Sequence, residues 1–261
     1  MSAIIRHEII ISILKEQGHA RVIDFAEQFN VTEETIRRDF TKLEKKGKII
    51  RKHGGAVLKE TLGGELSFDQ RRIQNIDEKT AIAKFALSYI KPGDTIFLDG
   101  STTAWQMSRY MPDIEITVIT DSIKVIASLM NHQKLNLISI GGQIWTPTQT
   151  MIGQGALDSV VNCHVNKCFF SCQGLDPEWG VSDNNSDIAA IKKAMLNHST
   201  EHYLLVDSDK LQAKSLIKFA DTSQIDFVFT DDKSAEKVIQ QLRDRNIQVH
   251  VVENKTNTYS D

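Results

Sequence analysis

The sequence predicts an α/β protein in which a small winged helix-turn-helix domain precedes a larger α/β domain. Three observations predict this fold class. The first 60 residues hold 12 Lys/Arg against 9 Asp/Glu, whereas the rest of the chain is acidic. Their apolar residues recur at helical spacing and are followed by a glycine-turned hairpin pattern. From Asp77 onward strand and helix patterns alternate, which is typical of a mostly parallel sheet covered on both faces.

Length and composition agree with this division. A chain of 261 residues is long for one ordinary domain, and 41% hydrophobic with 25% charged residues predicts a globular protein with a sizeable core. No run approaches about 18 apolar residues, and the start, MSAIIRHEII, carries charges where a signal peptide needs its apolar segment. We therefore expect a cytoplasmic protein with no membrane partner.

The three cysteines, Cys163, Cys168 and Cys172, cannot all pair with one another. A zinc site needs four ligands and more closely spaced Cys pairs. We expect free thiols buried in a strand, and neither a metal nor a cofactor.

Three helices are expected in the basic front part. The first covers Ile4 to Gln17, and the second ends at Asn30. The second buries Val22, Phe25, Ala26 and Phe29. Thr32 caps the third helix, whose first turn carries Glu33 and Glu34, where the helix dipole favours acids. Helix, short turn, helix is the arrangement in which the second of the two helices enters the major groove of DNA.

The third helix and the hairpin after it carry the charge expected of a DNA-binding surface. Ile36, Phe40 and Leu43 form the buried side of the helix, so the basic residues of TIRRDFTKLEKK face outward. Arginines early in such a helix reach guanine or phosphate. KIIRKHGGAVL alternates enough to form a wing that turns near Gly54-Gly55. The residues expected to contact DNA are Thr32, Thr35, Arg37, Arg38, Lys42, Arg51, Lys52 and His53. The alternative is a small helical domain with a charged, solvated face.

We divide the chain into a winged helix-turn-helix domain at 1–57, a linker at 58–76 and an α/β domain at 77–261. The linker contains Gly63-Gly64 and mixed charge without clear periodicity. In the α/β domain, helices are expected at 78–90, 104–111, 122–130, 156–161, 188–199 and 235–243. Strands are expected at 95–99, 116–120, 135–140, 167–171, 202–206, 227–230 and 249–252. Ligands of such folds bind beyond the carboxyl ends of the strands.

The loop DGSTT, Asp99 to Thr103, stands at one of these strand ends. It leads into a helix, whose N-terminus offers free backbone N–H groups and a positive dipole, and its hydroxyl groups add donors suited to a phosphate. Because Ser and Thr are also ordinary helix caps, capping alone is the alternative. The residues expected to bind an effector here are Asp99, Gly100, Ser101, Thr102 and Thr103.

Small and polar residues follow the other apolar runs as well, and their convergence on one rim favours a polar ligand. The further residues expected to bind the effector are Thr120, Asp121, Gly141, Gly142, Asp176 and Lys210. A plain turn is an equal alternative for Gly141-Gly142, and a solvated loop lysine is the alternative for Lys210.

The segment VTEETIRRDFTKLEKKGKIIRKHGGA resembles the N-terminal signature of the DeoR family of bacterial sugar-catabolism regulators. The run TIRRD, the glycine after the recognition helix and the R-x-HGGA wing carry the resemblance, and FDQRR, EKTAIAKFA, FLDGSTT, ISIGGQI and LLVDSDK extend it along the chain. The resemblance implies a transcriptional regulator that binds operator DNA and senses a sugar phosphate. It also implies a sensor domain with the fold of ribose-5-phosphate isomerase. We also expect a homo-oligomer, because one winged helix covers only a short site.

An enzyme of the isomerase type is the main alternative, and an inactive scaffold that binds no DNA is another. The isomerase moves protons with an acidic pair, a lysine and a glutamate. Where its first acid would stand, QGLDPE has Gln173, although it keeps Asp176, and VSDNNSDIAAIKKAM has Asp183 and Asp187 but no matching glutamate. The proton-transfer set is incomplete, so we expect a sensor and not an enzyme.

Some segments resemble the family members that control L-fucose operons more than the average member. Trp105, the PDI at 112–114, Cys172 and Asn185 carry that likeness. It makes a deoxy-sugar phosphate such as fuculose 1-phosphate one candidate effector. The likeness leaves open whether the protein represses or activates, because the family contains both.

Overall fold

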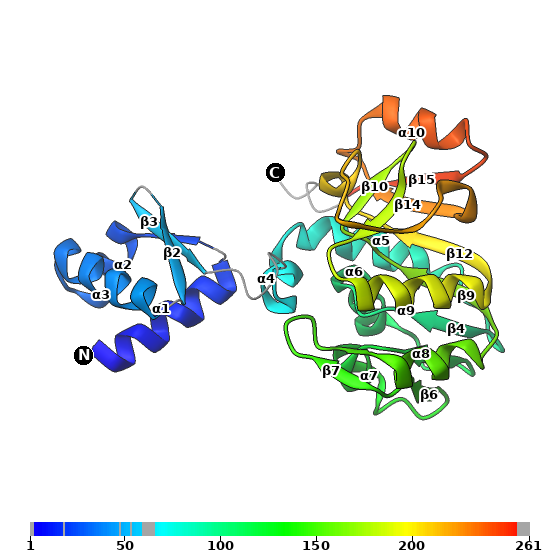
Figure 1. Cartoon of the computed structure of the whole chain (residues 1–261), viewed down its shortest axis with the longest axis horizontal. Helices are drawn as coiled ribbons and strands as arrows, with labels where there is room; N and C mark the ends of the chain where they lie inside the picture. The colour runs from blue at the N-terminus through cyan, green and yellow to red at the C-terminus, as the bar shows by residue number, and fades with distance from the viewer. Residues whose placement is uncertain (1–2, 18, 47, 53, 59–65, 255–261) are drawn as a thin grey trace, which may run out of the picture. The chain divides into compact units, whose positions relative to one another are not determined.

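The computed structural model describes residues 3–17, 19–46, 48–52, 54–58 and 66–254. Contacts within the chain divide it into two compact units, Met1–Gln74 and Asn75–Asp261 (Figure 1). None of the described helices is long and apolar enough to cross a membrane.

The first unit contains the three expected helices: α1 (Ala3–Gln17), α2 (Val22–Phe29) and α3 (Glu33–Lys45). Asn30 ends α2 in the left-handed conformation, with φ of 50°, and the Thr32 side chain caps α3 by accepting from the Thr35 backbone N–H. Both predictions are therefore confirmed. The apolar faces meet in one small core, which contains Ile10, Leu14, Phe25, Ile36, Phe40 and Leu43.

The predicted wing is confirmed and has one strand more than the sequence pattern suggested. β2 (Ile49–Lys52) and β3 (Gly55–Leu58) form the hairpin, and β1 (His19–Arg21) pairs with the other edge of β3. Three residues are too few to show alternation, so the sequence could not reveal β1. A Cβ on Gly55 would lie 2.5 Å from the Ala20 carbonyl oxygen, so this position needs glycine.

The segment 58–76, predicted as a linker, contains a short helix, α4 (Phe68–Ile73). A capping box starts it: the Ser67 hydroxyl accepts from the Gln70 backbone N–H, and the Gln70 side chain accepts from the Ser67 N–H. Six residues are too few for a clear helical period. Gly63-Gly64, the expected hinge, lies outside the described residues, and the two predicted boundaries, at 57/58 and 76/77, stay predictions.

The second unit contains a seven-stranded parallel sheet with the order β15-β14-β12-β9-β4-β5-β6. The predicted α/β fold class with a parallel sheet is confirmed. The strands are β4 (Thr95–Leu98), β5 (Thr117–Thr120), β6 (Asn136–Ser139), β9 (Val165–Phe170), β12 (Ser199–Leu205), β14 (Phe227–Asp231) and β15 (Gln248–Val252).

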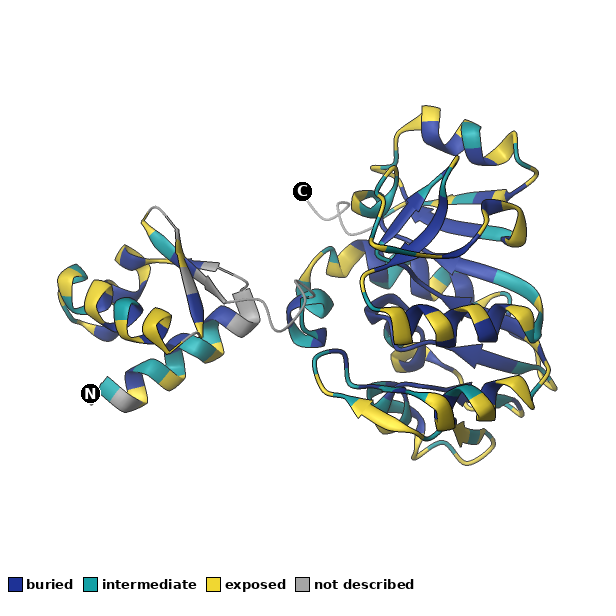
Figure 2. Ribbon diagram, viewed as in Figure 1, coloured by how far each residue is buried: buried dark blue, intermediate teal, exposed yellow. Residues whose placement is uncertain are grey.

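Helices cover both faces of this sheet, so the unit has three layers. One face packs on α5 (Ile76–Leu87), α6 (Thr102–Tyr110) and α7 (Ile123–Leu129). The other face packs on α8 (Gln154–Val161), α9 (Ser186–Asn197) and α10 (Glu236–Arg243). Figure 2 shows the central strands buried between these layers. Cys168 and Cys172 are buried free thiols, as expected, whereas Cys163 is half-buried.

Two small antiparallel sheets, which the sequence pattern did not predict, stand beside the strand ends. One is the hairpin of β7 (Gln143–Trp145) and β8 (Thr150–Ile152). The other has the order β10-β11-β13 and contains Gly174–Asp176, Gly180–Asp183 and Ile217–Ala220. Two short 3-10 helices, η1 (Ser208–Lys210) and η2 (Thr222–Gln224), complete the unit. These pieces add side chains to the rim where the parallel strands end.

Candidate functional site

The predicted DNA-contacting residues lie on the outer face of α3 and on the wing. Arg37, Arg38 and Lys42 are exposed on the helix, and Arg51 is exposed on β2. Thr32 is exposed at the start of α3, and Thr35 is half-buried one turn later. Lys52 lies in β2, and His53 is outside the described residues. The described side chains thus form one basic face on the first unit.

Each described arginine of this face has an acceptor within the unit. Arg37 and Arg38 pair with Glu33 and Glu34, at 2.5 and 3.3 Å. Arg51 donates instead to the neutral Thr41 hydroxyl, at 3.0 Å.

A buried aspartate, which sequence reasoning missed, fastens the recognition helix to α1. Asp39 is 2% exposed; it accepts from Arg6 Nε at 2.5 Å and contacts His7 Nε2 at 2.9 Å. Burial alone would raise the pKa of Asp39, but the hydrogen bonds and charges of Arg6 and His7 hold it below its usual value. The signal was present in the sequence, because Asp39 falls on the face of Ile36 and Leu43.

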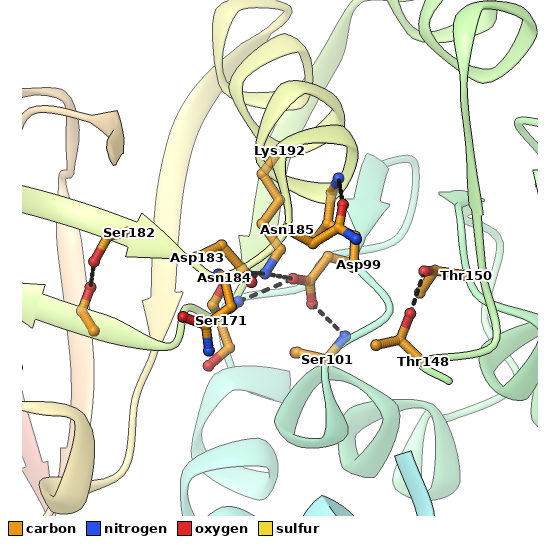
Figure 3. Close-up of polar contacts among 12 residues, drawn as sticks. Asp99, Ser101, Thr148, Thr150, Ser171, Ser182, Asp183, Asn184, Asn185 and Lys192 are labelled. Carbon is orange, nitrogen blue, oxygen red and sulfur yellow. Dashed lines mark hydrogen bonds and ion pairs between the residues drawn. The ribbon is translucent and has the colours of Figure 1, made fainter. Parts of the chain in front are cut away.

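In the second unit, polar side chains gather where β4, β9 and β11 end (Figure 3). Asp99, directly after β4, is fully buried. Its Oδ1 accepts from the Ser101 backbone N–H at 3.0 Å, and its Oδ2 accepts from the Ser171 N–H at 3.1 Å. Asp99 therefore joins the end of β4 to the end of β9.

Lys192 of α9 supplies the positive charge of this cluster and was not among the predicted residues. Its Nζ donates to Asp183 Oδ2 at 2.7 Å and to the Ser171 carbonyl at 2.8 Å, and it lies 3.5 Å from Asp99 Oδ2. Burial would lower the pKa of Lys192, but Asp183 and Asp99 outweigh it and raise the pKa above its usual value. We call Asp99, Asp121, Ser171, Asp183 and Lys192 the strand-end cluster.

The DGSTT loop starts α6 as predicted, and Ser101 is its N-cap: the Ser101 hydroxyl accepts from the Ala104 N–H at 3.1 Å. Thr102 and Thr103 are buried in the first turn. A Cβ on Gly100 would lie 2.1 Å from Thr150 Cγ2 and 3.3 Å from Asp121 Oδ1, so the glycine lets β8 and the loop meet.

Asp121 follows β5, where Thr120 accepts from the Ser122 N–H at 3.1 Å and so turns the chain into α7. Burial, together with the nearby charge of Asp99, raises the pKa of Asp121 to about 8. The two aspartates are therefore unequal, because Asp99 has Lys192 beside it and Asp121 favours the protonated form.

The other predicted rim residues have structural partners of their own. Asp176 accepts from the backbone N–H groups of Glu178 and Trp179 in the β10–β11 turn. Lys210 Nζ lies 3.8 Å from Asp207 Oδ2. Gly141 and Gly142 have positive φ, and a Cβ on Gly142 would lie 2.7 Å from the Ile152 carbonyl, so a turn alone accounts for both glycines. A ligand contact at these positions stays a prediction.

Three buried polar atoms near the start of α6 have no hydrogen-bond partner among the described residues: Thr103 Oγ1, Asp121 Oδ1 and Ser171 Oγ. A buried polar group without a partner costs about 1–3 kcal/mol, so such groups usually meet a ligand or water. In the described part of the chain, no group of three or more His, Cys, Asp or Glu residues is arranged to hold a metal ion.

A winged helix-turn-helix with outward arginines, on the same chain as a separate α/β domain, defines a DNA-binding transcriptional regulator. Residues 6–61 match the DeoR-like helix-turn-helix domain, and residues 74–232 match the DeoR C terminal sensor domain. The chain belongs to the DeoR family.

Relatives match over nearly the whole length. The HTH-type transcriptional regulator YulB of Bacillus subtilis is 40% identical over 95% of this chain and 96% of its own. The L-fucose operon activator of Haemophilus influenzae is 36% identical over 87% and 91%. A putative aga operon transcriptional repressor of Escherichia coli O157:H7 is 30% identical over 95% and 93%.

Among solved structures, ribose 5-phosphate isomerase A of Methanocaldococcus jannaschii is 19% identical, with a TM-score of 0.40 over 53% of this chain and 55% of its own. The eIF2B beta subunit of Chaetomium thermophilum is 15% identical, with a TM-score of 0.44 over 67% and 54%.

Proposed function

We propose that this protein regulates transcription of a sugar-catabolic operon and that a sugar phosphate, bound at the strand-end cluster, changes its affinity for operator DNA. The first unit presents Arg37, Arg38 and Arg51 to DNA, and the second unit binds the effector. As a DNA-binding protein it works in the bacterial cytoplasm, where the chromosome is. It is a homo-oligomer, because one winged helix covers too short a site for high specificity.

The observation that carries the effector site is the set of buried, unpartnered polar atoms at the N-terminus of α6. Thr103 Oγ1 and Ser171 Oγ are donors without an acceptor in the described structure. The free backbone N–H groups and the positive dipole of α6 favour an anion at the same place. A phosphate supplies both the negative charge and the acceptor oxygens that this end of the helix lacks.

The sugar is proposed from the relatives. The L-fucose operon activator is among them, and so are repressors named for the aga operon and for a lactose phosphotransferase system. Fuculose 1-phosphate is therefore the first effector to test. The same relatives include an activator and repressors. Measuring transcription with and without the effector decides whether this protein activates or represses.

We propose that the protein binds this sugar phosphate without converting it. A general base must be unprotonated near neutral pH before it can accept a proton, and Lys192 is not suited to this role, because Asp183 and Asp99 raise its pKa. The acidic set of the isomerase is also incomplete, since Gln173 stands where its first acid would be. Incubation with pentose and hexose phosphates should therefore give no isomerised product, and turnover would support an isomerase instead.

Two substitutions test the effector site. Thr103→Val keeps the shape of the side chain and removes its unpartnered hydroxyl, so the protein should stay folded while effector affinity falls about fivefold to a hundredfold, the equivalent of one lost hydrogen bond. Ser101→Asp keeps a capping residue but sets a carboxylate against the phosphate, and it should abolish the response.

The measurement is operator binding with increasing concentrations of each sugar phosphate. Ser108→Ala is the matched control, because Ser108 is a buried hydroxyl residue of the same helix whose hydroxyl already donates to the Trp105 carbonyl. A Ser101→Asp protein that answers at the wild-type effector concentration would show that the loop only caps α6.

A further inference from the structure

Asp121 is a buried acid that lies beside the loop proposed to hold the effector phosphate. The residue is 2% exposed, and its Oδ1 has no hydrogen-bond partner among the described residues. A Cβ built on Gly100 would lie 3.3 Å from this Oδ1, so the carboxyl group stands next to the loop that starts α6. A buried carboxylate without a partner is costly, and such a group usually takes up a proton instead.

The charged groups around Asp121 do not offset this cost. Burial and the charge of Asp99, which follows the neighbouring strand β4, raise the pKa of Asp121 to about 8. Lys192 of α9 opposes this rise only in part, since its ammonium is shared among three other acceptors, one of them Asp99. Lys124 stands in the first turn of α7, whereas β8 and the first turn of α6 carry no charged side chain.

A charged Asp121 would conflict with a phosphate at this place. The N-terminus of α6 favours an anion, and a sugar phosphate carries about two negative charges at neutral pH. A further negative charge beside the loop would repel it. A protonated carboxyl group removes this repulsion and also offers an O–H that can donate to a phosphate oxygen.

We propose that Asp121 is a specificity-determining residue of the effector site, which carries a proton when the effector is bound and donates a hydrogen bond to the phosphate. The site thus selects a phosphate dianion together with one proton. This inference rests on the effector site proposed above, and it adds to that site one donor and the charge of the phosphate that it accepts.

The direction of the pH dependence follows from this arrangement. Below pH 8 the free protein already holds most of the proton on Asp121, so the dianion binds with little proton uptake. At higher pH, binding must take the proton from the solvent, and the association constant should fall by about tenfold from pH 7 to pH 9. The phosphate ester stays a dianion over this range, because its own pKa is about 6.

The test is calorimetric titration of the full chain at pH 7, 8 and 9. The probes are the pentose and hexose phosphates named above, with fuculose 1-phosphate first. Asp121→Asn keeps an N–H donor and cannot ionise, so its affinity, whatever its value at pH 7, should stay constant up to pH 9. The affinity of the wild type should fall by about tenfold.

A second measurement counts the protons directly. Titrations in two buffers of different ionisation enthalpy give the number of protons that binding takes up. The wild type should take up about 0.8 proton more than Asp121→Asn at pH 9, and the two proteins should differ little at pH 7. A merely structural role of Asp121 would not produce this difference.

The matched control is Asp158→Asn, which makes the same chemical change at an exposed position of α8. Asp158 accepts from the Gln154 side chain at 2.6 Å, and an asparagine oxygen can accept in the same way. This variant should keep the pH profile of the wild type. Circular dichroism and the unfolding temperature, compared between variants, show whether a loss of binding is a loss of fold.

Equal pH profiles for the wild type and Asp121→Asn, or equal proton uptake at pH 9, would overturn the proposal and leave the effector site in place. If Asp121→Asn does not fold, the wild type decides alone: proton uptake that fails to rise between pH 7 and pH 9 contradicts the proposal. A wild type that binds none of the sugar phosphates at any of these pH values would overturn the proposed effector site, and this inference with it.

Discussion

Asp99 and Asp121 follow neighbouring parallel strands, and because both are buried, it is costly for both carboxyl groups to be charged at once. Asp99 is within 3.5 Å of the Lys192 ammonium, whereas Asp121 Oδ1 has no partner among the described residues. Two ionised carboxylates that are buried near each other would repel each other strongly. The raised pKa of Asp121 means that its carboxyl group favours the protonated form at neutral pH.

This arrangement predicts a pH dependence of stability with a definite sign. The pKa of Asp121 is about 8 in the folded protein and about 3.9 when unfolded, so folding takes up a proton between these values. The contribution of Asp121 to the free energy of unfolding is complete below pH 4 and is lost as the pH rises to 8. The Asp121→Asn variant cannot ionise at this position. Its free energy of unfolding should therefore rise relative to that of the wild type by about 1.4 kcal/mol per pH unit in this window.

Urea unfolding of both proteins at pH 5, 6, 7 and 8 measures this difference. Groups that titrate in both proteins cancel in the comparison. A difference in unfolding free energy that stays constant from pH 5 to 8 would contradict the raised pKa of Asp121.

At the level of single residues, the sequence revealed the polar groups directly after a strand and missed the one that arrives from a distant helix. Asp99, Ser101 and Asp121 were predictable because parallel strands end at a common rim. Lys192 was not, because only the fold brings α9 to that rim. Its signal was weak but present: it lies four residues after Ile188, on the buried face of α9, where an unpaired lysine is not expected.

The DGSTT loop depends on a close approach to the β7–β8 hairpin. A Cβ on Gly100 would lie 2.1 Å from Thr150 Cγ2, so Gly100→Ala should destabilise the protein by about 1–3 kcal/mol. Thr150→Ser removes that methyl group and keeps the hydroxyl that contacts Thr148 at 2.7 Å. The double variant should therefore regain much of the loss.

Thermal and urea unfolding of the wild type, both single variants and the double variant give the coupling energy of this contact. If the losses of unfolding free energy in the two single variants add up to the loss in the double variant, the Thr150 methyl group does not clash with the added Cβ. Gly100 would then be needed for its backbone conformation.

At the level of elements, length decided what could be predicted. The strands of the parallel sheet read as continuous apolar runs between polar turns, and each was located within a few residues. The hairpin strands have three residues each, and β7 is largely exposed, so neither period nor burial marked them. The β10-β11-β13 sheet was hidden for a further reason: β13 pairs with β11 across more than thirty intervening residues.

The whole molecule is expected to be a homo-oligomer held together by its second unit. A single winged helix reads few base pairs, and two copies on one duplex multiply both affinity and discrimination. Sedimentation of the full chain at micromolar concentration should show a species of at least two chains, with or without DNA. A monomer at these concentrations would contradict the prediction. Association that occurs only when DNA is present would show that the second unit does not hold the chains together by itself.

Regulation requires that the second unit, where the effector binds, changes the DNA affinity of the first. Thermodynamic linkage then makes the effect reciprocal: if the sugar phosphate changes operator affinity by some factor, operator DNA changes sugar-phosphate affinity by the same factor. Couplings of this kind are commonly about 5- to 150-fold. Titration of the effector into the full chain, with and without a saturating operator duplex, measures the second factor directly.

A variant with Arg37→Ala and Arg38→Ala separates the two sites in this experiment. It should lose operator binding, since each arginine that contacts a base contributes roughly 1–3 kcal/mol, and yet it should bind the effector with the affinity of the DNA-free wild type. Adding operator DNA should then leave its effector affinity unchanged. If DNA still changed the effector affinity of this variant, the coupling would pass through a DNA contact outside the recognition helix. Because the two factors must be equal at equilibrium, a difference between them in the wild type would show that one of the titrations had not reached equilibrium.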